Sequence, residues 1–257
     1  MTNQPTILLS NDDGYFAEGL SILKEAVADL GRIVVVAPDR DCSGISHKIS
    51  IHTPLRLRRI QEDAYALNGS PADCIHLAIH GVLDGRHPDL VISGINHGLN
   101  LGEDTAYSGT VAAAYEAFLQ EIPAIAVSSE MKKDRNNFAD AAAAARQLAV
   151  KALAGHDWFK RAVWNINVPI DRKHGFKLTQ LDSRSFKSSV VKRIDPRGHE
   201  YFWLGPYYPE YSHGDRTDFE ALKAGYVPLT PLKVEMTHNT LLQELWDAQE
   251  KIPWQEP

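Results

Sequence analysis

Two neighbouring aspartates, Asp12 and Asp13, are the residues whose type and spacing point most directly to chemistry in this 257-residue chain. They follow a short apolar run at residues 6–9, and Gly14 after them permits a sharp turn. Because successive strand side chains point to opposite faces, both carboxylates can face one point only where the strand has ended. Adjacent carboxylates repel each other, and a divalent cation between them removes that conflict. The alternative is a solvated turn, of which Asn-Asp-Asp-Gly is also typical.

Two further polar loops follow predicted strands and favour the metal interpretation. Ser43 lies just after the apolar run at residues 32–37, and Asn96 lies just after the run at residues 89–92. The carboxyl ends of parallel strands share one edge of an open sheet, which is where ligands bind in such folds. A serine hydroxyl and an asparagine carbonyl would complete an all-oxygen ligand set with the two aspartates. Such a set selects Mg²⁺, Mn²⁺ or Ca²⁺ over zinc or copper.

A third feature, the segment Ser108-Gly-Thr110, leads into a predicted helix over residues 109–121. Unpaired backbone N–H groups at a helix start bind phosphate, aided by the positive end of the helix dipole. The alternative is an ordinary serine or threonine cap. Together with the polar loops, this start gives the candidate phosphate-binding residues: Asn11, Gly44, Gly94, Asn96, Ser108, Gly109 and Thr110.

The reaction that fits these groups is phosphomonoester hydrolysis by a metal-activated water that attacks phosphorus in line, with Asp12 or Asp13 orienting the water or accepting its proton. Asp39-Arg-Asp41 offers an alternative, because it is similar to the nucleophile motif of phosphatases that form an aspartyl-phosphate on the first aspartate. A non-catalytic module that senses a nucleotide or metal in the same cleft is a third possibility. His76 and His80 have the i, i+4 spacing of a metal pair, but two surface histidines is the favoured interpretation.

Short β-branched runs alternate with helical patterns, which predicts a mainly parallel sheet with right-handed crossovers: a three-layer, doubly wound, Rossmann-like α/β fold. Residues 1–170 are predicted to form the catalytic core. Residues 171–257 are predicted to form an extension with a β-hairpin arm, turning at Asp195-Pro-Arg-Gly198, and a final helix over 239–250. The predicted strands span 6–9, 32–37, 89–92, 124–128 and 163–168, with a looser antiparallel strand in 48–59; the other predicted helices span 18–30, 71–83, 109–121 and 138–153.

Composition excludes several classes of partner. The net charge is 27 − 33 = −6 and no run of five like charges occurs, which argues against binding to a nucleic-acid polymer. The longest apolar runs are strand-sized, so no membrane span is expected. The two cysteines, Cys42 and Cys74, suit a reducing compartment, and the first residues lack signal-peptide features. We therefore expect a cytoplasmic protein. From its chain length we expect a folded surface of roughly 11,000 Å².

Five ordered motifs resemble the SurE family, the survival-protein-E nucleotidases. The resemblance implies a phosphatase that acts on nucleoside 5′- and 3′-monophosphates, with some action on short polyphosphate. It implies one divalent cation per subunit, Mg²⁺ or Mn²⁺ with Ca²⁺ as a non-native substitute, held by Asp12, Asp13, Ser43 and Asn96. It also implies a homodimer or homotetramer that exchanges the C-terminal arm. The motifs lie at residues 7–14, 36–44, 67–74, 88–98 and 107–111.

Overall fold

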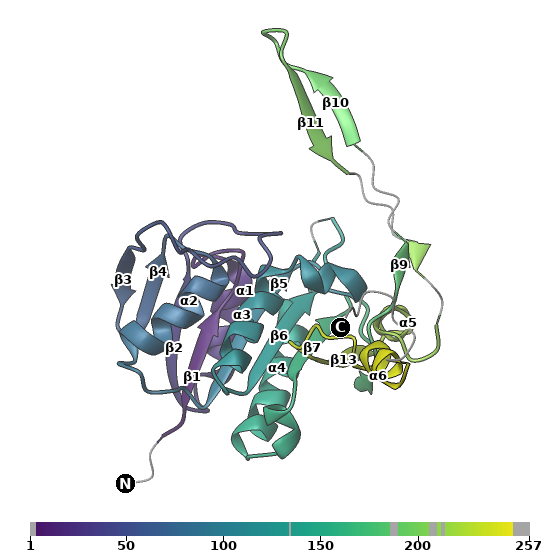
Figure 1. Ribbon diagram of the computed structural model, residues 1–257. Helices are drawn as coiled ribbons and strands as arrows, with labels where there is room; N and C mark the ends of the chain where they lie inside the picture. The colour runs from purple at the N-terminus through teal and green to yellow at the C-terminus, as the bar shows by residue number, and fades with distance from the viewer. Residues whose placement is uncertain (1–3, 134, 186–189, 206–209, 212–213, 249–257) are drawn as a thin grey trace, which may run out of the picture.

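A nine-stranded sheet forms the centre of the computed structural model, which describes residues 4–133, 135–185, 190–205, 210–211 and 214–248 (Figure 1). The strand order is β3-β4-β2-β1-β5-β6-β7-β13-β8. The strands are β1 (Thr6–Ser10), β2 (Arg32–Pro38), β3 (Leu57–Gln61), β4 (Ala64–Leu67), β5 (Leu90–His97), β6 (Ala124–Ser129), β7 (Val163–Val168), β8 (Phe176–Leu178) and β13 (Val227–Leu232).

The sheet is mainly parallel, as the sequence predicts. The run from β4 through β2, β1, β5 and β6 to β7 is parallel throughout. Only β3, on β4, and β13, on β7, pair antiparallel within this sheet. The parallel strands therefore end on one edge, where Asp12, the loop with Ser43, and Asn96 on the last part of β5 meet.

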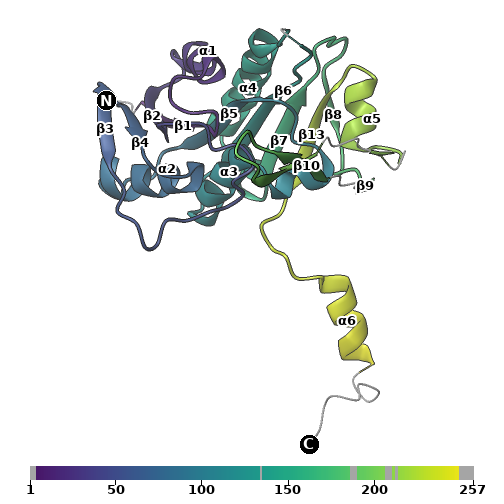
Figure 2. The same ribbon diagram turned by 90° about the horizontal axis from the view of Figure 1, so that it is seen from above.

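Helices cover both faces of the sheet and complete the three layers (Figure 2). Adjacent strand residues supply the two cores: Leu9 packs in one cluster with Leu23, and Leu8 packs in the other with Ile75. One face carries α1 (Glu18–Val27) and α4 (Phe138–Leu153), and the other carries α2 (Pro71–Leu77) and α3 (Gly109–Leu119).

Some predicted boundaries are wrong. The strand predicted to end at residue 92 continues to His97, because β5 resumes its pairing with β6 after a register irregularity between Ser93 and Asn96. Asn96 therefore lies near the end of a strand. The predicted strand in 48–59 forms only from Leu57, and the helix predicted over 71–83 is α2 followed by a wider π-type turn, Ala78–Val82.

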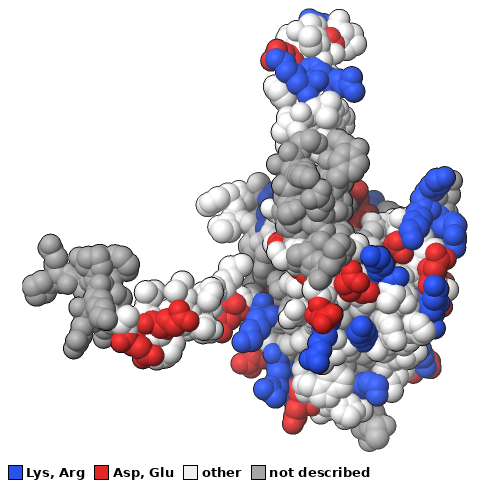
Figure 3. Space-filling view, turned by 90° about the vertical axis from the view of Figure 1, so that its right-hand side faces the viewer, with Lys and Arg blue, Asp and Glu red and all other residues white. Residues whose placement is uncertain are grey.

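The segment after residue 170 contributes to the sheet and also projects from it. Strands β8 and β13 belong to the main sheet, and a separate antiparallel hairpin confirms the predicted arm. The hairpin stands out from the body in Figure 1 and the final helix stands out in Figure 2, and Figure 3 shows the two projections together. They help to explain why the exposed surface, 14834 Å², exceeds the roughly 11,000 Å² expected from chain length. The elements are β9 (Arg184–Ser185), which pairs with β12 (Glu210–Tyr211), the hairpin β10 (Val190–Ile194) and β11 (Glu200–Leu204), α5 (Asp218–Lys223) and α6 (Asn239–Asp247).

No helix in the described part of the chain combines the length and apolar character needed to cross a membrane.

Candidate active site

Asp12 lies where β1 ends and is buried against the start of α3. Its Oδ1 accepts a hydrogen bond from Oγ1 of Thr110. The backbone of α3 comes so close that a Cβ built on Gly109 would lie 2.8 Å from the Cβ of Asp12. Burial raises the pKa of Asp12 to about 6; the Thr110 bond lowers it and the charge of Asp13 raises it further. The site thus holds a carboxylate that has been removed from water.

Asp13 faces the end of β5. Its Oδ2 accepts a hydrogen bond from the backbone N–H of His97 at 3.1 Å, and its Oδ1 lies 3.9 Å from Nδ1 of the same histidine. Burial raises the pKa of Asp13, while the charge of His97 opposes that rise. The continuation of β5 to His97 therefore connects the end of β1 to the end of β5.

The loop with Ser43 is anchored to both neighbouring segments. The backbone N–H of Cys42 donates to the carbonyl of Asp12 at 2.8 Å, and the N–H of Ser46 donates to the carbonyl of Tyr107 at 2.9 Å. Ser43 itself donates to Oδ1 of Asp41, at 2.7 Å from its N and 2.6 Å from its Oγ. Asp41 therefore orients the Ser43 hydroxyl.

A cavity of about 240 Å³ lies between these loops. Nδ2 of Asn96 donates to the carbonyl of Gly98 at 3.0 Å, which fixes the orientation of that amide. The predicted site residues that line the cavity are Asp12, Ser43, Gly44, Asn96 and Ser108. The remaining lining residues are His97, Gly98, Leu99, Asn100, Asp104 and Tyr107.

Other predicted residues lie beside the cavity or away from it. Gly109 and Thr110 contact Asp12 from behind, and Ser108 also caps α3 by accepting a bond from Val111 N at 3.1 Å. Asn11 is buried, and its Nδ2 donates to the carbonyl of Gly14 at 2.9 Å, so it shapes the turn after β1.

Gly94 serves the packing of the sheet. A Cβ at this position would lie 2.4 Å from the carbonyl oxygen of Val127 on β6. The structure does not bring Gly94 into the lining of the cavity.

Sequence reasoning missed a buried amide network beneath the cavity. The backbone N–H of Asn100 donates to Oδ1 of Asn167 at 2.8 Å, and its carbonyl accepts from Nδ2 of Asn165 at 2.9 Å and of Asn167 at 3.0 Å. Nδ2 of Asn100 donates to Oγ of Ser128 at 2.8 Å. Two asparagines spaced by two residues share one face of a strand, and that signal could have revealed the network.

The residues of the alternative interpretations lie elsewhere. Asp39 is exposed, pairs with Arg40 at 3.3 Å and is absent from the cavity lining. The rings of His76 and His80 are tilted at 48° to each other with centroids 4.7 Å apart, and Nδ1 of His76 also contacts Oε1 of the buried Glu116 at 3.1 Å.

Comparison with known proteins identifies the family. The family model described as "Survival protein SurE" matches residues 7–188. The 5′-nucleotidase SurE of Vibrio cholerae serotype O1 is 43% identical over 242 residues, covering 93% of this chain and 95% of its own. The 5′-nucleotidase SurE of Laribacter hongkongensis is 44% identical over 241 residues, covering 93% and 96%. The crystal structure of the SurE protein from Aquifex aeolicus is similar with a TM-score of 0.82 and 38% identity, covering 95% of this chain and 100% of that one. The chain belongs to the SurE family.

Proposed function

We propose that the protein is a divalent-metal-dependent phosphomonoesterase that hydrolyses nucleoside 5′- and 3′-monophosphates and also cleaves short-chain polyphosphate. The observation that carries this proposal is the meeting of Asp12, Ser43 and Asn96 in one cavity beside the start of α3. The curated relatives, which bear the name 5′-nucleotidase, support the nucleotide substrate.

The donor atoms fit a hard divalent cation such as Mg²⁺ or Mn²⁺. Asp12 is a buried carboxylate beside a second one, Asp13. A cation would offset the cost of burying these negative charges and the repulsion between them. Ser43 and Asn96 add neutral oxygens, which complete the hard set. Among the described residues no group of three or more His, Cys, Asp or Glu side chains is arranged for a metal. This candidate set has only two such side chains and draws its other ligands from a hydroxyl and an amide.

When bound, the cation supplies a Lewis acid for the phosphoryl group and makes water a stronger nucleophile. The chain's own groups do the rest. One of the two aspartates accepts the proton of the attacking water, and Asp12 is the one that lines the cavity. Gly44 and Ser108, which line the cavity at the loop after β2 and at the start of α3, contribute neutral donors to the phosphate dianion.

The test is a panel of nucleoside monophosphates assayed for phosphate release after thorough chelation and again after addition of Mg²⁺, Mn²⁺ or Ca²⁺. We expect the chelated protein to be inactive and Mg²⁺ or Mn²⁺ to restore turnover. Full activity in the chelated protein would contradict metal dependence. Binding of nucleotides without any phosphate release would favour the sensing module.

The hairpin supports an assembly by exchange of arms. Its exposed apolar side chains include Ile194, Phe202, Trp203 and Leu204, which a second subunit would cover. We therefore propose a homodimer or homotetramer, to be tested by native mass measurement.

The two buried free cysteines, Cys42 and Cys74, support a cytoplasmic location.

A further inference from the structure

A second cavity, of about 300 Å³, borders the same loop as the active-site cavity. Ile45 lines the second cavity and Gly44 lines the first, so consecutive residues, with Cα atoms about 3.8 Å apart, contribute to both walls. Polar residues dominate the lining of this second cavity, among them Arg40, Lys48, Ser50, Thr53, Asn68 and Ser70.

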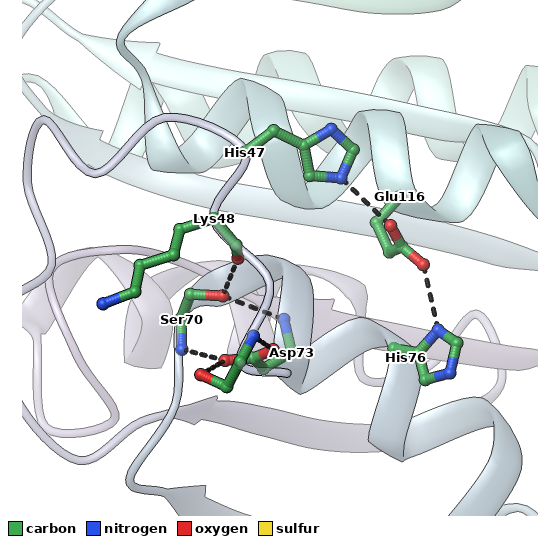
Figure 4. A network of polar contacts seen from close by, with 7 residues as sticks. His47, Lys48, Ser70, Asp73, His76 and Glu116 are labelled. Carbon is green, nitrogen blue, oxygen red and sulfur yellow. Dashed lines mark hydrogen bonds and ion pairs between the residues drawn. The ribbon is translucent and has the colours of Figure 1, made fainter. Parts of the chain in front are cut away.

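The second cavity is basic, although the chain as a whole carries a net charge of −6. It is lined by two cations, Arg40 and Lys48, and by no acidic residue. Lys48 makes no ion pair with any residue that the structure describes, and Figure 4 shows its side chain extending from the loop away from the bonds between Ser70 and Asp73. The pair of Arg40 with Asp39 is largely exposed, so an incoming anion can compete for that guanidinium.

A buried carboxylate close to this cavity, Asp73, has both of its oxygens hydrogen-bonded by internal donors. Its Oδ1 accepts from Ser50 N at 2.8 Å, and its Oδ2 accepts from Ser50 Oγ at 2.7 Å and Ser70 N at 2.9 Å (Figure 4). Asp73 itself does not line the cavity, and these bonds satisfy both of its carboxylate oxygens. The positive charges of the cavity therefore remain for a ligand.

The wall that carries Lys48 is fixed in place. Its carbonyl accepts a hydrogen bond from Oγ of Ser70 at 2.6 Å. The preceding residue, His47, has its Nε2 3.0 Å from Oε2 of the buried Glu116 on α3 (Figure 4). These bonds hold the backbone on either side of the exposed Lys48 side chain, so an anion that binds there does not have to order the loop.

We propose that this second cavity is a subsite for a phosphate group in addition to the one that is cleaved. Its ligand is the second phosphate of a nucleoside 3′,5′-bisphosphate, whose two phosphates are separated by the ribose, or free inorganic phosphate with the same chemistry. The first of these sources rests on the proposed nucleotidase function. The second does not, because binding of inorganic phosphate requires no turnover.

The test compares the wild-type protein with Lys48→Gln, Arg40→Gln and the double variant. The quantity measured is the ratio of kcat/KM for a nucleoside 3′,5′-bisphosphate to kcat/KM for the matching 5′-monophosphate. We expect this ratio to fall about tenfold in the double variant, because charged hydrogen bonds to the second phosphate are lost. Lys151→Gln, an equal change of charge at an exposed position on α4, is the control and keeps the wild-type ratio.

A second measurement titrates inorganic phosphate into the chelated wild-type and double-variant proteins by calorimetry. A fall in the bisphosphate ratio identifies the substrate's own second phosphate as the ligand. An unchanged ratio with weaker binding of inorganic phosphate identifies free phosphate. If neither quantity changes, the subsite is refuted. If the wild-type protein hydrolyses no monophosphate, the proposed function fails, and the calorimetry alone decides on the subsite.

Discussion

Oγ1 of Thr110 donates a hydrogen bond to Oδ1 of Asp12, and this bond joins the start of α3 to the end of β1. The bond lowers the pKa of Asp12, but burial outweighs it, so the pKa rises from 3.8 to about 6. Because the pKa is higher in the folded protein than in the unfolded chain, the metal-free fold loses stability as the pH rises between these two values. At about 1.4 kcal/mol per pH unit, the loss is about 3 kcal/mol.

The variant Asp12→Asn removes that ionisation. We expect the chelated variant to unfold with a free energy up to about 3 kcal/mol higher than the wild type at pH 7, and with no such advantage below about pH 4. Urea unfolding of both chelated proteins at the two pH values measures this. Turnover should fall by several orders of magnitude, and near-normal turnover would contradict the role of Asp12 as a ligand.

Thr110→Val keeps the shape of the side chain and deletes the donor. Because the lost bond lowers the pKa of Asp12, we expect that pKa to rise above about 6, which carboxyl NMR titration of the chelated protein can measure. The proposed turnover should fall about tenfold as Asp12 loses its fixed orientation. Thr230→Val, which deletes a buried hydroxyl bonded to Thr179 on the far part of the sheet, is the matched control. A pKa shift in both variants would show that the effect is not local.

Gly109→Ala tests the close approach of α3 to the site. The new Cβ would lie 2.8 Å from Cβ and 3.0 Å from Oδ2 of Asp12, so the carboxylate must move. We expect the apparent affinity for Mn²⁺, read from activation curves, to fall at least tenfold, although alanine is the better helix former. Gly175→Ala has open space around its Cβ and should leave the curve unchanged. Equal Mn²⁺ activation curves for the wild type, Gly109→Ala and Gly175→Ala would refute the close approach of α3 to Asp12.

The meeting of Asp12, Ser43 and Asn96 could be predicted because each follows an apolar run and parallel strands end on one edge. The continuation of β5 to His97 could not, since it depends on pairing with β6 across an irregular register. The same holds for the contact of Asp13 with His97, which follows from that continuation.

Strand β13 shows a second limit of sequence patterns. Pro228 and Pro231 lack the N–H that a ladder requires, so the local sequence argues against a strand between two others. The strand nonetheless lies between β7 and β8, about sixty residues after β7 in the chain. Its burial against both neighbours outweighs the local preference, and no periodicity in the sequence encodes that pairing.

Asp39→Asn distinguishes the two phosphatase mechanisms. The Asp39 side chain pairs with Arg40 on the surface and does not line the active-site cavity. We expect the variant to keep turnover within about threefold of the wild type, because it removes only an exposed ion pair. A rapid-quench search for phosphorylated protein should find none. An inactive variant together with a trapped phosphoenzyme would establish the aspartyl-phosphate mechanism instead.

Glu116→Gln tests the contact between Glu116 on α3 and His47 on the loop after β2. The quantity tested is how the stability of the fold depends on pH. The hydrogen bond from His47 lowers the pKa of Glu116, burial raises it, and the bond from His76 lowers it again, with a net shift below 4.5. A carboxylate whose pKa is lower in the folded state stabilises the fold above its unfolded pKa and loses that effect as the pH falls through the folded value. We therefore expect the variant to be about 1–3 kcal/mol less stable than the wild type at pH 7, and the gap to narrow below pH 4.5. Urea unfolding across this range measures the gap, with Glu25→Gln, an exposed position on α1, as the control. A gap that stays constant with pH would show that Glu116 acts through packing and not through its charge.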